Sequence, residues 1–431
     1  MKNMDNTDKL LQLIEEGTSP FHVVKSAADQ LEDAGFIRLE ADKEWGLNAG
    51  SRYYLSYNGT SLFAFSIGKR FGYRDNFRIA AAHTDFPCIK IKPNPDIAVE
   101  KYAQVNVEIY GGAILNTWLD RPLSVSGRVV LKSIDIFKPE IRLVNFKKPI
   151  MTIPNLAIHM NKEVNKGVEL NKQTDMLPIV GMITEELNKD HYFMNYLAER
   201  VGVDTEDILD YELTVYNTDA GDLIGINEEF ISAPRLDNLT SVQALVTAII
   251  DGGRANGINI IALFDHEEIG SRTKQGAGSM LLSMVVEKIY ATLGRDRLNF
   301  MGAMADSLLL SVDVAHGLHP NQTAKNDPTN KCILNGGVCL KEAAGQTYAT
   351  DSEAVAIIQQ ICHAGKIPYQ KFVNRSDGTA GSTLGSIASA ILPVRTVDAG
   401  VPLLAMHSSR ELMGRQDQDS MTELVKSFFS L

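Results

Sequence analysis

Cysteine is scarce in this chain, and the few that occur form no cluster. The 431 residues include Cys88, Cys332, Cys339 and Cys362, and no two of them have Cys-x-x-Cys spacing. Such a set indicates neither a disulfide framework nor a zinc site built from thiolates. We expect these thiols to be buried or incidental.

Long apolar runs are also missing. No stretch approaches the ~20 residues that a membrane-spanning helix requires. The first residues, Met1 to Asp5, lack the apolar centre of a signal peptide. These two absences predict a cytoplasmic protein that does not act on a membrane.

Positive charge is in deficit, since 42 lysines and arginines face 53 aspartates and glutamates, giving a net charge of -11. This balance disfavours nucleic acid or an anionic membrane as the main partner. The hydrophobic share of 44% and the charged share of 22% are ordinary for a globular protein. A chain of 431 residues exceeds one simple core, so we expect two domains.

Helix and strand patterns alternate at the start of the chain. Ser19-Pro20 is typical of a helix start, and apolar residues then recur at helical spacing up to Gly35. Asn58-Gly59, between two apolar runs, indicates a β-hairpin. Residues 77–82 predict a buried strand.

The pattern changes at about residue 93. The stretch Lys92-Pro93-Asn94-Pro95 is rich in residues that break regular structure. Strand patterns dominate from there to Pro234, with a helical excursion at residues 177–201; they cover residues 105–110, 123–131 and 141–146. We therefore predict an inserted, mostly β domain at residues 93–234.

The alternation resumes at residue 235. The predicted elements are a helix after Asp237, a strand at 258–264, a helix at 279–293, a strand at 308–312, a helix at 352–364 and a strand at 394–397. This order predicts an α/β fold whose mixed sheet is flanked by helices. Residues 1–92 and 235–431 would form this discontinuous domain.

Four ionisable residues follow the strand at 258–264, namely Asp265, His266, Glu267 and Glu268. Charged groups at the end of a buried strand are costly to desolvate unless a positive charge lies nearby, and a metal ion is the simplest one. Adjacent strand residues point to opposite faces. One glutamate could therefore bind the ion while the other acts as general base on a bound water. The alternative is that both glutamates begin a solvated helix.

Other possible metal ligands also follow apolar runs. His83 ends one run and has Asp85 two residues on, which suits a histidine ligand oriented by a carboxylate. Asp313 and His407 follow two further runs, and Asp237 stands where a loop meets a helix. Taken singly, each residue has a structural explanation, such as a buried histidine or a helix N-cap.

These positions could converge, because ligands bind beyond the carboxyl ends of strands in open α/β sheets. A single sheet could bring His83, Glu268, Asp313 and His407 to one edge, and Asp237 could join them from its loop. Two histidines and three carboxylates suit two zinc ions with one bridging aspartate. The sequence thus predicts a dinuclear metal site.

Five motifs occur in order along the chain: His83-Thr84-Asp85, Arg235-Leu236-Asp237-Asn238, Asp265-His266-Glu267-Glu268-Ile269-Gly270-Ser271, Ser311-Val312-Asp313-Val314-Ala315-His316 and Ala405-Met406-His407-Ser408. Together they resemble the aspartyl aminopeptidase family of zinc peptidases, and the similarity runs over nearly the whole chain. The resemblance implies a zinc-exopeptidase-like fold and removal of the N-terminal residue from peptides.

The resemblance also implies a role for each motif residue. Two zinc ions per subunit would be bound by five ligands, with Asp237 bridging them: His83, Asp237, Glu268, Asp313 and His407. Glu267 would be the general base, and Asp85 would orient His83.

Substrate contacts and assembly follow from the same resemblance. It implies substrate contacts by His159, His316, Lys341 and Tyr348, with His159 reaching the active site of a neighbouring subunit. The inserted domain would mediate dimer contacts, and dimers would build a homo-oligomeric dodecamer. Taken alone, Lys341 would be an ordinary surface lysine. With the resemblance, Lys341 or His316 could select an acidic side chain by charge, although a neutral N-terminal residue is equally compatible with the sequence.

Two other functions are compatible with the same motifs. A dizinc deacylase or carboxypeptidase of related fold would need a cation for the substrate carboxylate, which Arg375 or Arg410 could supply. A catalytically idle assembly scaffold would use the fold without turnover. Candidates at all five ligand positions and at Glu267 argue against the scaffold.

Overall fold

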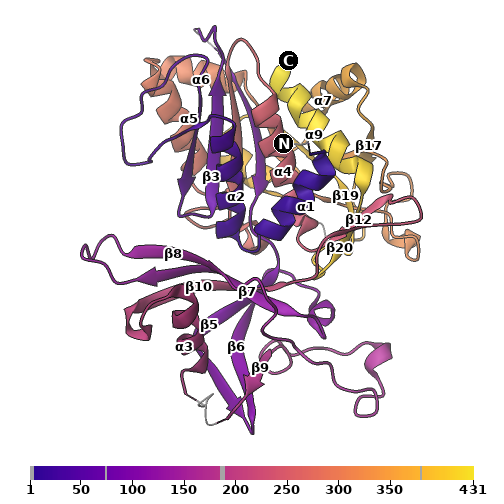
Figure 1. Ribbon diagram of the computed structural model, residues 1–431. Helices are drawn as coiled ribbons and strands as arrows, with labels where there is room; N and C mark the ends of the chain where they lie inside the picture. The colour runs from indigo at the N-terminus through magenta and orange to yellow at the C-terminus, as the bar shows by residue number, and fades with distance from the viewer. Residues whose placement is uncertain (1–3, 73–74, 185–189, 379–380) are drawn as a thin grey trace. The chain divides into compact units, whose positions relative to one another are not determined.

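The computed structural model describes residues 4–72, 75–184, 190–378 and 381–431 of the chain (Figure 1). The chain divides into two compact units. The first unit comprises residues 1–86, 221–406 and 411–431, and the second comprises residues 87–220 and 407–410. The second unit is therefore inserted into the sequence of the first.

The first unit is built on a nine-stranded mixed sheet. In spatial order its strands are β1 (Ile37–Arg38), β2 (Arg52–Tyr57), β3 (Ser61–Ile67), β13 (Ile258–Phe264), β4 (Phe77–His83), β14 (Leu308–Val312), β18 (Arg395–Gly400), β16 (Val338–Lys341) and β17 (Tyr369–Phe372). The four strands β13, β4, β14 and β18 run parallel to their neighbours within this group. This part of the sheet positions the site described below.

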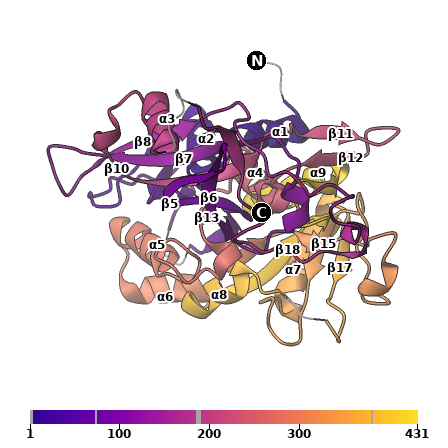
Figure 2. The same cartoon turned by 90° about the horizontal axis from the view of Figure 1, so that it is seen from below.

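Helices cover both sides of this sheet, as Figure 2 shows. One side carries α5 (Leu281–Thr292), α6 (Arg297–Ala305) and α8 (Leu384–Ile391), and the other carries α1 (Asn6–Glu16), α2 (Pro20–Asp33), α4 (Leu236–Asp251) and α9 (Arg415–Ser430). A further helix is α7 (Ser352–Gly365). The predicted α/β class with a mixed sheet between helices is confirmed.

The sheet is apolar because it is covered on both faces. Every residue of β13 is buried, and its alternate residues Ile258, Ile260, Ala262 and Phe264 join one core with side chains of α5, α6 and α8. Period-two alternation turns the intervening residues to the opposite face, where α4 packs against β13 and β4. Strands buried on both faces read as nearly continuous apolar runs, which explains the pattern at 258–264.

A second, five-stranded sheet also belongs to the first unit. Its strands in order are β11 (Asp222–Ile224), β12 (Phe230–Ala233), β20 (Glu411–Gly414), β19 (Pro402–Leu404) and β15 (Ala315–His316). His407 follows β19 and not a strand of the nine-stranded sheet. The expectation that one sheet delivers all four strand-end ligands is therefore wrong for His407.

The second unit is an antiparallel sheet of six strands. Their order is β8 (Glu140–Asn145), β7 (Leu123–Leu131), β10 (Ile208–Asn217), β5 (Cys88–Val99), β6 (Tyr102–Tyr110) and β9 (Ile179–Met182). The predicted helical excursion at 177–201 is wrong in its first part, which forms β9. Helix α3 spans only Tyr192–Val201, and residues 185–189 lie outside the described part of the chain.

The boundaries of the units lie at 86/87 and 220/221 and not at the expected 92/93 and 234/235. At the second boundary, β11 pairs with β12, and β12 pairs with β20 of the first unit. At the first, the Lys92–Pro95 stretch does not break β5, whose pairing with β6 shifts register between Ile91 and Asp96. A bulge tolerates proline, which cannot donate a hydrogen bond to the ladder.

Several local predictions are confirmed. Asn58 and Gly59 have φ angles of 53° and 73°, as a tight hairpin turn between β2 and β3 requires. All four cysteines are buried and unbridged.

The helices in the described ranges were compared with the length and hydrophobicity that a membrane-spanning helix needs. Not one of them is both long and apolar enough to cross a bilayer.

Candidate metal centre

Three neighbouring parallel strands end at the same edge of the large sheet. Phe264, the last residue of β13, lies opposite His83, the last residue of β4. Asp265 continues from β13, and Asp313 follows β14 on the other side of β4. Ionisable side chains therefore gather where ligands bind in open α/β sheets.

Asp237 reaches this edge from the irregular first turn of α4. Asp237 and Asn238 have non-helical dihedral angles and are joined by a cis peptide bond. The Asp237 amide donates to Oε2 of Glu411 at 3.0 Å, and the Asn238 side-chain amide donates to the Val312 carbonyl at 3.0 Å. The turn is thus fixed between β20 and β14. Asp237 is not the N-cap of α4, which is Arg235.

His83 is the centre of this group. Its Nε2 lies 3.4 Å from Oδ1 of Asp237 and 3.5 Å from Oδ1 of Asp313. Its Nδ1 lies 3.0 Å from the backbone carbonyl oxygen of Asp85. A carbonyl only accepts hydrogen bonds, so Nδ1 carries the proton and Nε2 turns a lone pair toward the two carboxylates.

These distances suit ligands of a shared ion better than hydrogen bonds. An N–H···O bond spans about 2.7–3.2 Å, whereas ligands bonded to one tetrahedral zinc at ~2.0–2.1 Å stand about 3.3–3.4 Å apart. Single ligand atoms of His83, Asp237 and Asp313 all lie within 4.8 Å of one another, as do those of His83, Glu267 and Glu268. Imidazole and carboxylate are donors that zinc accepts, so the residues present fit the ion.

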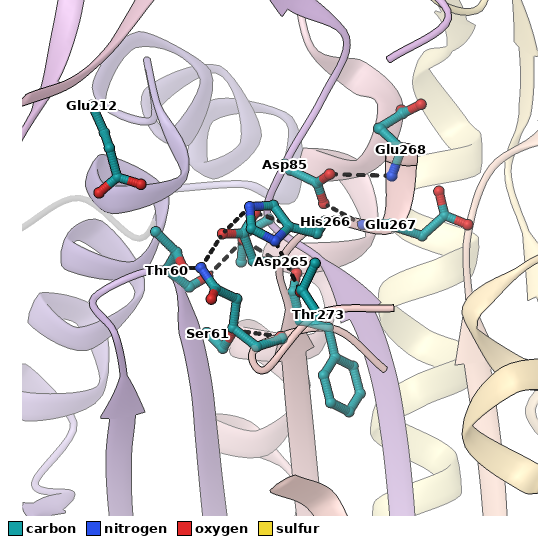
Figure 3. A network of polar contacts seen from close by, with 12 residues as sticks. Thr60, Ser61, Asp85, Glu212, Asp265, His266, Glu267, Glu268 and Thr273 are labelled. Atoms are coloured by element: carbon teal, nitrogen blue, oxygen red, sulfur yellow. Dashed lines mark hydrogen bonds and ion pairs between the residues drawn. The ribbon is translucent and has the colours of Figure 1, made fainter. Parts of the chain in front are cut away.

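Glu267 and Glu268 lie on a short 3-10 turn after β13. Figure 3 shows the Asp85 carboxylate beside this turn, where its two oxygens accept the backbone N–H groups of Glu267 at 3.0 Å and Glu268 at 3.1 Å. The Asp85 carboxylate lies 3.5 Å from Nδ1 of His83. The sequence predicted that the Asp85 carboxylate orients His83. In the structure the backbone carbonyl of Asp85 orients the ring, and its carboxylate accepts the backbone N–H groups of the two glutamates.

The electrostatics of this cluster call for a cation. Burial raises the pKa of Glu267 to about 8, and Asp313, Asp85 and Asp237 add to the shift while His83 opposes it. Burial and the charge of Asp237 raise the pKa of Glu268 well above its usual value. Burial lowers the pKa of His83, but the negative charge of the carboxylates around it outweighs burial and raises that pKa well above normal. A metal ion would relieve this crowding of negative charge.

Lys341 lies beside the same cluster, at the end of β16. Its side chain is 1% exposed, so the alternative of an ordinary surface lysine is wrong. Its Nζ donates to the Val314 carbonyl at 3.0 Å, lies 3.8 Å from Oδ2 of Asp313 and sits 5.0 Å from the centre of the Tyr348 ring. The ring of Phe372 lies 6.2 Å from Tyr348 and 6.3 Å from His316. Three of the four expected substrate contacts therefore lie in one neighbourhood.

His407 and His159 belong to the second unit. His407 Nδ1 lies 3.2 Å from the carbonyl oxygen of Gly112, so this ring also carries its proton on Nδ1 and presents Nε2. His159 is exposed in a turn of the loop between β8 and β9. Their assignment to the metal site and to the substrate stays a prediction.

Sequence comparison decides the family. The profile of the family described as "Aminopeptidase I zinc metalloprotease (M18)" matches residues 13–429. The chain belongs to this family.

Individual M18 relatives agree over the full length. The "Probable M18 family aminopeptidase 2" of Clostridium acetobutylicum is 43% identical over 433 residues, covering 100% of both chains. A chain in the cryo-electron microscopy structure of the Ape4 and Nbr1 complex is 34% identical, with a TM-score of 0.94 over 98% of this chain and 85% of that one. The S. cerevisiae mApe1 dodecamer is 26% identical, with a TM-score of 0.83 over 99% of this chain and 96% of that one. This M18 member is a metallo-aminopeptidase, a hydrolase of peptide bonds.

A polar network supports the turn that carries Glu267 and Glu268 in this M18 aminopeptidase (Figure 3). Asp265 accepts the backbone N–H of His266 at 2.8 Å and the Gln275 side-chain amide at 3.1 Å. His266 Nδ1 pairs with the Thr273 hydroxyl at 2.9 Å, and Gln275 also donates to Thr60 Oγ1 at 3.2 Å. Asp265 and His266 thus support the turn, while Glu267 and Glu268 face the site.

Sequence reasoning did not find every residue that shapes this M18 site. Glu411, which accepts the Asp237 amide, lies four residues after His407, and Gln275 lies in the loop after β13. The available sequence signal for Glu411 was an acidic residue close after His407. Gln275 had none, because its role depends on contacts with Thr60 and Asp265.

Proposed function

We propose that this M18 aminopeptidase is a dinuclear zinc enzyme whose ligands are His83, Asp237, Glu268, Asp313 and His407. Asp237 would bridge the two ions. The observation that supports this most is the spacing of His83 Nε2 from the Asp237 and Asp313 oxygens, 3.4 and 3.5 Å. Several buried carboxylates surround one imidazole, and their combined negative charge is larger than a single ion of charge +2 would balance. This excess supports two ions.

When bound, the zinc ions would polarise the scissile carbonyl and acidify a water molecule. Glu267 would take the proton of that water on its carboxylate and return it to the departing amine. The hydrogen bond from the Glu267 amide to Asp85 would hold the base in place during both transfers. His83 would keep Nε2 directed at the ions through its bond to the Asp85 carbonyl.

We further propose a preference for peptides with an acidic N-terminal residue. Lys341 is a buried cation next to the carboxylate cluster, and its positive charge would attract a substrate carboxylate. His316 and Tyr348 lie in the same neighbourhood and would complete the pocket. With a neutral N-terminal side chain, the counter-charges near Lys341 would be those of the chain itself, Asp313, Asp398 and Glu267.

Assembly is part of the proposal. We propose a homo-oligomer in which dimers, formed through the inserted unit, build a dodecamer, and in which His159 contacts substrate in a neighbouring subunit. The dodecameric mApe1 relative and the exposure of His159 support this arrangement. A cytoplasmic location stays a prediction.

The decisive experiment is a panel of aminoacyl p-nitroanilides, assayed with and without a chelator, for the wild type and Glu267→Gln. We expect chelation to abolish turnover, because the ions supply the Lewis acid. Glu267→Gln should retain zinc and lose turnover by a factor of about 10²–10⁴, the usual contribution of a general base. The exposed Glu287→Gln on α5 is the matched control. Near wild-type turnover in Glu267→Gln would show that another group moves the proton.

A further inference from the structure

Asp398 is a buried carboxylate with no part in the metal-binding set. It lies on β18 and is 0% exposed. Its Oδ1 accepts the Thr383 hydroxyl and its Oδ2 accepts the Ala349 backbone N–H, both at 2.6 Å. The Asp398 backbone N–H donates to the Thr350 hydroxyl at 2.8 Å. A charged group buried this deeply requires such partners.

Two of these bonds hold the loop that connects β16 to α7. Ala349 and Thr350 directly follow Tyr348, so the hydrogen bonds to Asp398 fix the backbone beside that residue. The Tyr348 ring in turn covers the ammonium group of Lys341 at 5.0 Å. Displacement of this loop would therefore move the aromatic wall next to the lysine.

Lys341 also faces Asp398 across the sheet. The two residues are direct partners in the antiparallel pairing of β16 with β18. Directly opposite residues of an antiparallel pair point to the same face of the sheet, so the Asp398 and Lys341 side chains lie on one face. Asp398 and Asp313 thus both place a carboxylate near this buried lysine.

The first turn of α8 packs closely against the same carboxylate. A Cβ placed on Gly385 would lie 2.6 Å from Oδ1 of Asp398. Glycine lets the amino end of this helix approach the carboxylate, where the helix dipole favours a negative charge. Asp398 on β18 is therefore fixed by contacts with both the Tyr348 loop and the start of α8.

We propose that Asp398 is a positioning residue that fixes Lys341 and Tyr348 and thereby sets the discrimination between acidic and neutral N-terminal side chains. This inference rests on the proposed function. Asp398 is fully buried, so it acts through Lys341 and Tyr348 and does not touch the substrate itself. The role is distinct from metal binding, because its hydrogen bonds reach Thr383, Ala349 and Thr350.

The test compares kcat and KM for aspartyl and alanyl p-nitroanilides in the zinc-loaded enzyme and two variants. Asp398→Ala removes both the anchor of the loop and the charge that faces Lys341. It should raise KM for the aspartyl substrate about tenfold, and so lower the aspartyl-to-alanyl ratio of kcat/KM about tenfold, because small misplacements of binding groups have effects of this order. Alanyl turnover should change by less than about threefold. Asp398→Asn keeps the shape and removes the charge; its amide oxygen can still accept the Ala349 N–H while its NH2 donates to the Thr383 hydroxyl, so the ratio should fall by about threefold.

The matched control is Asp417→Ala on α9. Asp417 is equally buried and accepts two backbone N–H groups, from Asn335 at 2.7 Å and Gly337 at 2.8 Å, which precede β16 and are not part of the Tyr348 loop that follows it. Its substrate ratio should equal that of the wild type. An unchanged ratio in Asp398→Asn, or an equal shift in Asp417→Ala, overturns the inference. If Asp398→Ala does not fold, the Asn variant decides alone. Absence of metal-dependent turnover in the wild type would refute the proposed function instead.

Discussion

At the scale of single residues, the geometry of the site depends on which atoms of its side chains form hydrogen bonds to the backbone. The Nδ1 atom of His83 is committed to the Asp85 carbonyl, so Nε2 is directed to Asp237 and Asp313. The Asp85 carboxylate is committed to two backbone amides, which places Glu267 and Glu268. Backbone hydrogen bonds of this kind orient metal ligands as effectively as side chains do.

Glu411 provides a residue-scale prediction. Its carboxylate accepts the Asp237 amide and is 2% exposed, so it holds the first turn of α4 in place. Glu411→Ala should weaken zinc binding by about 10–100-fold, because groups that orient a ligand commonly contribute that much. Zinc affinity is measured by competition with a chromogenic chelator, with the exposed Glu228→Ala as control. Equal affinity in the two variants would show that Glu411 does not position Asp237.

At the scale of elements, β13 connects the core to the chemistry. All seven of its residues are buried, and its end delivers Asp265 to Glu268 to the sheet edge. Its parallel pairing with β4 places Phe264 opposite His83. The register of these two strands therefore sets how His83 lies relative to the residues that follow β13. Packing errors in β13 would therefore displace the candidate metal ligands.

Ile260 tests this dependence. It is 0% exposed within the core shared with α5, α6 and α8. Ile260→Ala should reduce stability by about 2–5 kcal/mol, because it removes buried apolar volume and leaves a cavity. Chemical denaturation followed by circular dichroism measures the change, and Ile134→Ala, at a position that is 106% exposed, should be neutral. A loss in Ile260→Ala no larger than that of the control would contradict the packing described here.

Elements also show what the sequence could and could not reveal. The continuous apolar runs before His83, Asp265 and Asp313 predicted three buried strands, because strands covered on both faces have little polarity to alternate. The burial of Lys341 was not predictable, since β16 has only four residues and its partner β18 is far away in sequence. The bulge that admits Pro93 and Pro95 into β5 was likewise invisible, because it depends on pairing with β6.

At the scale of the whole molecule, the chain interrupts its first unit with a second one. His407 directly follows residue 406 in the sequence, where the second segment of the first unit ends, so the last proposed ligand belongs to the second unit. The irregular start of α4 was also unpredictable, because Asp237 is fixed by Glu411, a residue 174 positions further along the chain. Residues distant in sequence therefore have to come together before the ions can bind.

The central claim is that this chain binds two zinc ions through the strand-end carboxylates and histidines. It is tested most directly by the zinc content of each polypeptide, measured by plasma mass spectrometry after equilibrium dialysis against buffered zinc. Two ions per chain are predicted for the wild type, with loss of bound zinc in Asp237→Ala, because the bridging ligand serves both ions. A wild type without zinc, or an Asp237→Ala variant that still holds two ions, would contradict the claim.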